Sequence, residues 1–182
     1  MAICLSRIVE RWGATDEEIR DHWPCDDLPL EADHDLYRAV TVRATPATVY
    51  RWLCQLRVAP YSYDWIDNWG RTSPRTLTPG LEDLEVGQRF MIFRLAAFAP
   101  DDHVTLTSRT AAFGEVAITY RVRPHPDGAR LVAKLRIGYP RNPYGRLARA
   151  FLPAGDLVMM RRQLLNLARL AEATPAPVLS GA

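Results

Sequence analysis

The sequence ends in an amphipathic helix that has no apolar partner near it along the chain. Over residues 156–173, apolar side chains recur at steps of three and four residues, which is the spacing of one helix face. These side chains are Leu157, Met160, Leu164, Leu167 and Ala171. Arg162, Asn166 and Arg169 lie on the opposite face. Because the apolar face has to be buried, we expect the helix to lie against the concave face of a curved β-sheet, with room for an apolar guest between them.

Length and composition favour one domain in the cytoplasm. The 182 residues fall in the size range of single domains, about 50–250 residues, and 48% of them are hydrophobic, which is enough for a buried core. No apolar run approaches the roughly 20 residues that cross a bilayer, and residues 1–18 lack the pattern of a secretory signal. A net charge of +2, with arginines scattered along the chain, does not favour a nucleic-acid partner.

Cysteines and histidines form no disulfide or metal pattern. Cys4, Cys25 and Cys54 are far apart and lack a CxxC pair, so we expect reduced and mostly buried thiols. The histidines show no HxxH or HExxH spacing. His22 and Cys25 lie among aspartates, but Pro24 interrupts the helical geometry that would aim both at one metal ion. We therefore expect no metal and, because phosphate and dinucleotide loops are also missing from the sequence, no cofactor.

Residues 1–35 are expected to form an arm with one short helix. Thr15 and Glu18 match a capping box, in which a hydroxyl and a carboxylate accept hydrogen bonds from free backbone N–H groups at a helix start. Pro24 should end this helix. The stretch from there to Asp35 is acidic and contains prolines, so we expect it to lie extended over the domain.

Alternating residues predict the strands. Residues 36–43 place Leu36, Arg38, Val40 and Val42 on one face. Thr45 and Pro46 then begin a helix. Further strands are predicted at residues 88–95, 103–109, 115–123 and 129–139. The last two should form a hairpin, because Asp127 and Gly128 between them are a strong turn signal.

This order of elements resembles the helix-grip fold of the START/polyketide cyclase (SRPBCC) superfamily. Residues 11–18, 61–65 and 155–164 are similar to segments of an uncharacterised bacterial branch of that superfamily. The resemblance implies an α+β domain over residues 36–173, in which a curved antiparallel sheet wraps around the long C-terminal helix. Residues 174–182 are expected to be a disordered tail. Since the superfamily includes lipid carriers, hormone receptors and polyketide cyclases, the fold does not choose between binding and catalysis.

Candidate ligand contacts come from the inward faces of the predicted sheet and helix. They are Phe90, Ile92, Leu106, Ile118, Tyr120, Leu135, Ile137, Met160 and Leu164. These residues form core in any case and contact a ligand only if a cavity is open.

Tyr61, Tyr63 and Trp65 either line the mouth of that cavity or pack the connector onto the sheet. For Asp64 and Trp69 we favour a structural role, with Asp64 facing solvent or capping a turn.

Two arginines share strand faces with apolar residues. A guanidinium of Arg38 or Arg94 that pointed into the hollow would need a carboxylate or an anionic ligand beside it. Because both arginines stand near predicted strand ends, we expect their stems to pack on the core and their charges to reach solvent.

The segment of residues 144–152 mixes apolar residues with arginines. It could rest on an anionic membrane surface, without stable insertion. The alternative is that it forms the first turns of the terminal helix, bent at Pro153, with Tyr144, Leu147 and Phe151 packed inward.

The leading hypothesis is a binding protein that encloses a small hydrophobic or amphipathic molecule, such as a lipid, an isoprenoid or a polyketide-like compound. The competing hypothesis is a cyclase or dehydratase in which Tyr63, Asp64 or Arg94 transfers protons in the same cavity. A third is an interaction module whose N-terminal arm docks a protein partner, and the identity of any protein partner is left open.

Overall fold

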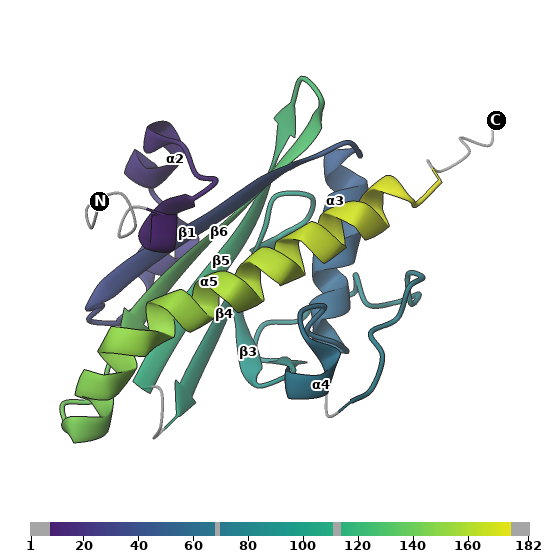
Figure 1. The fold of residues 1–182 in the computed structure, drawn as a ribbon. Coiled ribbons are helices and arrows are strands. Elements are labelled where there is room, and N and C mark those ends of the chain that lie inside the picture. Colours follow the sequence, from purple (N-terminus) through teal and green to yellow (C-terminus); the bar gives the residue numbers. More distant parts are fainter. Residues whose placement is uncertain (1–7, 68–69, 111–113, 176–182) are drawn as a thin grey trace.

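A six-stranded antiparallel sheet and one long helix dominate the structure, a computed structural model that describes residues 8–67, 70–110 and 114–175. The strands, in the order β1-β6-β5-β4-β3-β2, are β1 (His34–Val42), β2 (Arg89–Phe90), β3 (Phe93–Ala99), β4 (His103–Thr110), β5 (Gly114–His125) and β6 (Gly128–Gly138). The helices are α2 (Asp16–Arg20), α3 (Pro46–Cys54), α4 (Asp64–Asp67) and α5 (Pro143–Glu172), with short 3-10 turns η1 (Pro24–Asp27) and η2 (Gln55–Arg57). Figure 1 shows α5 running across one face of the sheet, so the predicted α+β helix-grip architecture is confirmed.

The hairpin of β5 and β6 supplies the centre of the inner sheet face. Its inward pairs are Val116 with Ile137, Ile118 with Leu135, Tyr120 with Ala133 and Val122 with Leu131, as the alternation predicts. The predicted turn at Gly128 has a φ of 132°, and a Cβ atom there would lie 2.5 Å from the carbonyl oxygen of Val42. Glycine is therefore required where the hairpin passes the end of β1.

The predicted strand at residues 88–95 is wrong, because the chain reverses direction inside it. β2 ends at Phe90, Met91 and Ile92 form the turn, and β3 begins at Phe93, which pairs with Phe90. Met91 takes the positive φ of 52° that a tight two-residue hairpin turn needs. No glycine, proline or asparagine marks this turn, and the apolar alternation continues through it, so the sequence pattern concealed it.

The main core lies between the inner sheet face, α3 and α5. The N-cap of α3 is Thr45, as predicted, and Trp52 on this helix is buried. On α5, Leu164 and Leu167 are buried, whereas Leu157 is only half-buried. The C-terminal half of α5 is therefore the part that seals the core.

The N-terminal arm covers the outer sheet face. The predicted capping box at Thr15 is present, and Trp23 of the arm is buried in a second apolar cluster. The other members of this cluster are Cys25, Tyr37, Ala39, Ala117 and Val132. Lys134 of β6 reaches the arm, with its Nζ 2.6 Å from the carboxylate of Asp26.

Cys25 and Cys54 are free and buried, as predicted. Burial raises the pKa of the Cys54 thiol to about 12, so this thiol is protonated at neutral pH. Cys4 lies outside the described residues, as do Trp69 and the tail of residues 176–182.

The segment of residues 144–152 forms the first turns of α5, with Pro153 inside the helix. The expected inward packing of its large side chains is wrong, since Tyr144, Leu147 and Phe151 are 77%, 60% and 67% exposed. Ala148 and Leu152, four residues apart on the other face, pack against the core instead. In the described part of the chain, no helix is long and apolar enough to cross a membrane.

Candidate functional site

A pocket of about 460 Å³ lies between the inner face of the sheet and the middle of α5. Its apolar wall on the sheet is formed by Phe93, Val116, Ile118, Leu135 and Ile137. Leu152, Met159 and Met160 of α5 close the opposite side, and Pro60 and Ile66 of the connector complete it. The lining is mostly apolar, and the thioether side chains can adjust their shape to an irregular guest.

The edge of the sheet is irregular in β3. The register of β3 against β4 shifts between Leu95 and Ala97, and such a bulge increases the local twist and bends the strand. Beyond Leu164, in contrast, α5 packs directly on the core. The pocket therefore lies against the middle of α5, from Leu152 to Gln163, and the core is packed beyond it.

A buried ion pair borders the pocket. Arg38 is fully buried on β1, and its Nη2 lies 2.8 Å from a carboxylate oxygen of Asp156 on α5. Its Nη1 donates to the carbonyl oxygen of Tyr37 at 2.8 Å. The expectation that Arg38 reaches solvent is therefore wrong, because α5 lies over β1 at this point and supplies the carboxylate that a buried guanidinium needs.

Asp156 is the ionisable carboxyl group of the pocket lining. Burial raises its pKa to about 6, although the charge and the hydrogen bond of Arg38 act in the opposite direction. Burial also lowers the pKa of Arg38, which remains a cation because its ordinary value is so high. The carboxyl group of Asp156 can thus gain or lose a proton close to neutral pH.

Tyr120 and Gln163 form a second pair of hydrogen-bonded polar side chains in the pocket lining. The hydroxyl group of Tyr120 donates to Oε1 of Gln163 at 2.7 Å, and Nε2 of Gln163 donates to the carbonyl oxygen of Pro60 at 2.7 Å. Burial raises the pKa of Tyr120, which keeps the phenol neutral. These bonds join the sheet, α5 and the connector at one side of the pocket.

The structure brings together some of the candidate ligand contacts and separates the others. Ile92, Ile118, Tyr120, Leu135, Ile137 and Met160 line the pocket. Phe90, Leu106 and Leu164 are buried in the core outside the pocket lining. Tyr61, Tyr63, Asp64 and Trp65 line a different groove, between the connector and the C-terminal half of α5. That the first group contacts a ligand remains a prediction.

The candidates for proton transfer do not meet at one point. The carboxylate of Asp64 accepts hydrogen bonds from the backbone N–H and the hydroxyl group of Ser73, which is the turn-capping role that we favoured. Arg94 pairs across the sheet with Arg89 and donates to the carbonyl oxygen of Gly87. It points away from the pocket that holds Asp156.

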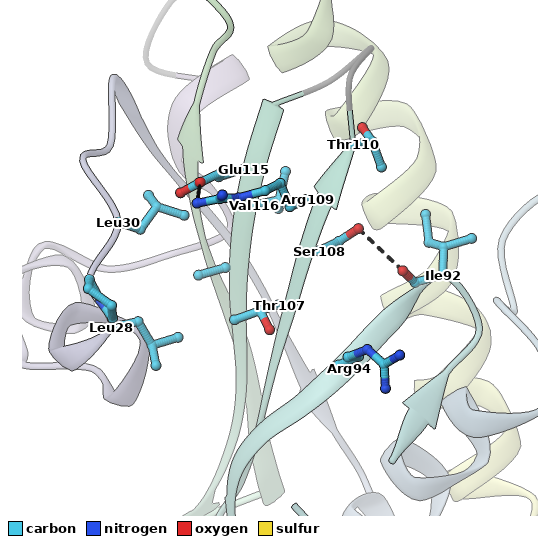
Figure 2. A pocket seen from close by; sticks show the side chains of 12 residues that line it. Leu28, Leu30, Ile92, Arg94, Thr107, Ser108, Arg109, Thr110, Glu115 and Val116 are labelled. Carbon is cyan, nitrogen blue, oxygen red and sulfur yellow. Dashed lines mark hydrogen bonds and ion pairs between the residues drawn. The ribbon is translucent and has the colours of Figure 1, made fainter. Parts of the chain in front are cut away.

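Figure 2 shows the trough on the outer sheet face to which Arg94 belongs. Leu28 and Leu30 of the arm form one side of this trough. The charges of Arg109 and Glu115 are joined in an ion pair, and the hydroxyl group of Ser108 donates to the carbonyl oxygen of Ile92. These polar groups are paired with one another, so few of them are left to form hydrogen bonds or ion pairs with a ligand.

Sequence reasoning missed Asp156 and Gln163. Between Pro143 and Ala171, Asp156 is the only acidic residue, and it stands four residues from both Leu152 and Met160 on the inward face. A lone carboxylate at a buried helix position, opposite an arginine on an apolar strand face, is a signal for a buried ion pair. Reading Arg38 and Asp156 together would have found the pair.

The side chains around His22 that could have bound a metal ion contact other residues instead. The ring of His22 lies 3.0 Å from Asp27, while Asp26 contacts Lys134. Within residues 8–67, 70–110 and 114–175, no group of three or more histidine, cysteine, aspartate or glutamate side chains could hold a metal ion.

Comparison with solved structures supports the fold. No family model and no curated protein matches this chain. A structural-genomics protein of Chromobacterium violaceum is 18% identical over 77% of this chain and 99% of its own length, with a TM-score of 0.52. A second, from Mesorhizobium loti, is 18% identical over 79% of this chain and 100% of its own, with a TM-score of 0.51.

More distantly, the chain is similar to the di-domain ARO/CYC StfQ from the steffimycin biosynthetic pathway. The identity is 13% over 76% of this chain and 50% of that chain, with a TM-score of 0.46, a level of similarity that says nothing about function. The fold and the pocket together define a helix-grip protein. The solved structures and the order of elements therefore confirm the helix-grip fold that the resemblance implies.

Proposed function

We propose that this protein binds a small hydrophobic or amphipathic molecule in the pocket under α5. The observation that carries the proposal is the pocket itself, about 460 Å³ and lined mostly by apolar side chains. Ligand sites commonly have volumes of about 300–1,000 Å³ and combine an apolar lining with a few placed polar groups. A lipid fragment, an isoprenoid or a polyketide-like compound has this character.

The polar groups of the pocket narrow the ligand class. Asp156 shares one carboxylate oxygen with Arg38, and an ionised carboxylate can accept further hydrogen bonds. A ligand with a hydroxyl group at one end would donate to Asp156 while its apolar part fills the space between Ile118 and Met159. An anionic headgroup would be repelled by the same carboxylate.

A neutral fluorescent probe tests this proposal. Nile red should bind to the protein with a rise in fluorescence, and dodecanol should displace it. Ile118→Phe narrows the pocket and should weaken probe binding, whereas Val158→Phe, on the exposed face of α5, should not. Equal probe binding by the two variants would refute the pocket as the binding site.

We further propose that the protein works in the cytoplasm and collects its ligand by transient contact with a membrane. The exposed side chains of Tyr144, Leu147 and Phe151 support this, because they lie on the same helix turns as Leu152 of the pocket lining. Co-sedimentation with anionic vesicles should fall in the Leu147→Ser/Phe151→Ser variant. Equal sedimentation of both proteins would exclude this mode of contact.

A second candidate function is proton transfer in the same pocket, and the position of Asp156 favours it. A carboxyl group with a pKa of about 6 suits a general acid or base near neutral pH. In this scheme Asp156 exchanges the proton and Arg38 positions the carboxyl group of Asp156. The hydroxyl group of Tyr120, whose own proton is donated to Gln163, accepts a hydrogen bond from a substrate hydroxyl group. If Asp156→Asn left turnover of a polyketide-like substrate unchanged, the enzyme scheme would be wrong, while the binding proposal would stand.

A further inference from the structure

A second groove, which we call the connector groove, lies on the other side of the connector from the pocket. It has a volume of about 740 Å³ and is formed by residues 61–65 and 72–75 on one side and by the C-terminal half of α5 on the other. Of the residues that the structure describes, Ser62 alone lines both the connector groove and the pocket. The two are therefore separate binding surfaces.

Three arginines line the connector groove, and in the described part of the chain no carboxylate pairs with them. Arg75, Arg162 and Arg169 are all exposed. Among the described residues, none of their guanidinium groups forms a hydrogen bond or an ion pair, whereas Arg38, on the inner face, has its own carboxylate. Within the described part of the chain, no carboxylate neutralises the positive charge of these three arginines.

Among the side chains that the structure describes, the carboxylate of Asp64 is the one acidic group in the lining of the connector groove. It accepts hydrogen bonds from Ser73 at 2.8 Å and 2.5 Å and contacts none of the three arginines at ion-pair distance. Its charge reduces but does not cancel the positive charge of the groove. An anion that approaches the arginines meets a net attraction.

Aromatic rings stand beside these arginines. Trp65 lines the groove and is 75% exposed, which is unusual for a side chain that is highly buried on average. The guanidinium of Arg162 lies over the ring of Tyr63, 5.7 Å from its centroid. A planar group could stack on the free indole of Trp65 while its charge meets the arginines.

The helix sets the spacing of two of the cations. Arg162 and Arg169 are seven residues apart on α5, about two turns or ~10 Å along the axis. Between them, Asn166 donates to the carbonyl oxygen of Tyr61 at 2.8 Å and fixes the connector to the helix. This bond holds the connector against α5, between the two arginines.

We propose that the connector groove binds a small molecule that combines a planar aromatic ring with a phosphate or carboxylate group. The ring stacks on Trp65, and the guanidinium groups of Arg162 and Arg169 bind the anionic oxygens. The two parallel N–H donors of a planar guanidinium group match the spacing of carboxylate or phosphate oxygens. The volume of the groove is in the range of small-molecule sites. This site is independent of the apolar pocket and does not rest on its function.

Four probes distinguish the parts of this proposal. ADP and 2-naphthoate each carry both a ring and an anion, whereas adenosine lacks the anion and pyrophosphate lacks the ring. Binding is measured by isothermal titration, with quenching of tryptophan fluorescence as a second readout. ADP or 2-naphthoate should bind most strongly. Tighter binding of ADP would indicate phosphate recognition, and tighter binding of 2-naphthoate would indicate carboxylate recognition. Binding should weaken as salt is added.

Variants locate the site and provide a matched control. The Arg162→Gln/Arg169→Gln variant should weaken binding about tenfold or more, since a hydrogen bond to a charged group contributes about 1.5–3 kcal/mol. Trp65→Ala should remove the fluorescence response. Arg161→Gln is the control, because this neighbouring arginine lies over the ring of Trp12, away from the groove.

The proposal is overturned if none of the four probes binds at millimolar concentration. It is also overturned if Arg161→Gln weakens binding as much as the Arg162→Gln/Arg169→Gln variant. Far-UV circular dichroism confirms that each variant is folded, which we expect because the substituted side chains are exposed. Filling the apolar pocket with Ile118→Phe should leave binding in the connector groove unchanged.

Discussion

The two faces of the sheet both carry buried cations, and they are covered in different ways. On the outer face, Lys134 and Arg136 meet carboxylates of the arm and of β1, and Trp23 packs directly on the strands. On the inner face, Arg38 pairs with Asp156, and an apolar pocket lies beside the pair. The outer face is covered closely around Trp23, and its trough is lined in part by Leu28 and Leu30 of the arm. The inner face retains an apolar pocket under α5.

The difference follows from the kind of segment that covers each face. The arm consists of short turns and extended chain, so it can follow the surface of the strands residue by residue. α5 is a single helix of 30 residues, and a stiff rod cannot follow a concave sheet along its whole length. An apolar space is therefore left under α5, whereas the outer face is packed around Trp23 and the polar groups of its trough are paired with one another.

The largest effect should come from breaking the inner ion pair. Arg38→Met leaves Asp156 buried without its cation, which should lower the free energy of unfolding by about 3–5 kcal/mol. Urea denaturation at neutral pH measures this loss. A loss below about 1 kcal/mol would mean that the pair is hydrated and that the inner face is more open than described.

The double variant Arg38→Met/Asp156→Leu is the control for that experiment. It removes both charges and replaces them with apolar side chains of similar size, so it should recover most of the stability that Arg38→Met loses. If the double variant were as unstable as the single one, lost packing and not the unpaired carboxylate would explain the effect.

The pH dependence of stability should separate the two faces. Burial raises the folded-state pKa of Asp156 to about 6 from the ordinary 3.8. The folded state therefore binds this proton more tightly than the unfolded state, and the contribution of Asp156 to stability falls as pH rises from about 4 to about 6.

On the outer face, burial works to raise the pKa of Asp26, but hydrogen bonds from Lys134 and from the backbone of Trp23 outweigh it and lower the pKa. The contribution of Asp26 is therefore present above about pH 4 and is lost in acid.

Comparing the wild type with Asp156→Asn isolates the inner carboxyl group. The difference in their free energies of unfolding should change by up to about 3 kcal/mol between pH 4 and pH 7. Urea titrations at both pH values measure it. A difference that does not vary with pH would show that Asp156 titrates in the folded protein as it does in the unfolded chain.

A smaller effect is expected on the outer face. Lys134→Met removes one partner of Asp26, but the carboxylate keeps the hydrogen bond from the backbone of Trp23 at 3.0 Å and the nearby charge of Arg136. We expect a loss of about 1–2 kcal/mol in the free energy of unfolding. If Lys134→Met lowered the free energy of unfolding as much as Arg38→Met does, the ion pairs of the two faces would contribute equally to stability, which would contradict the expected difference.

The smallest effect should be at Trp65. Because its indole is mostly exposed, Trp65→Ala should change the free energy of unfolding by less than about 0.5 kcal/mol. The buried Trp52, whose Nε1 donates to Thr174 at 2.8 Å, should cost about 3–5 kcal/mol when it is truncated. Thermal denaturation of the two variants makes the comparison, and a large loss at Trp65 would argue that it packs rather than binds.

The sequence predicted those parts of the fold that depend on periodicity. The alternation of β5 and β6 and the apolar stripe around Leu164 are local patterns, so they identified the inner face correctly. The turn at Met91 was missed because its residues carry no turn signal. The inward packing of Phe151 was wrong because its position on α5 depends on how the helix lies across the sheet, which no local pattern records.

The site was harder to predict than the fold for the same reason. Six of the candidate contacts line the pocket, and four of them, Ile118, Tyr120, Leu135 and Ile137, do so because they share the inner face of β5 and β6. The pairing of Arg38 with Asp156 joins residues 118 positions apart, and the placement of Trp65 depends on where the connector lies against α5. Such contacts between distant segments are properties of the assembled structure and not of any single segment.

The central claim is that the pocket under α5 holds a small apolar or amphipathic molecule. Native mass spectrometry of the protein, purified from its own host without detergent, tests this most directly. We predict a species heavier than the bare chain by the mass of one small molecule, which organic extraction releases and which is reduced in Ile118→Phe. A spectrum showing only the bare chain, together with no binding of Nile red, would contradict the account.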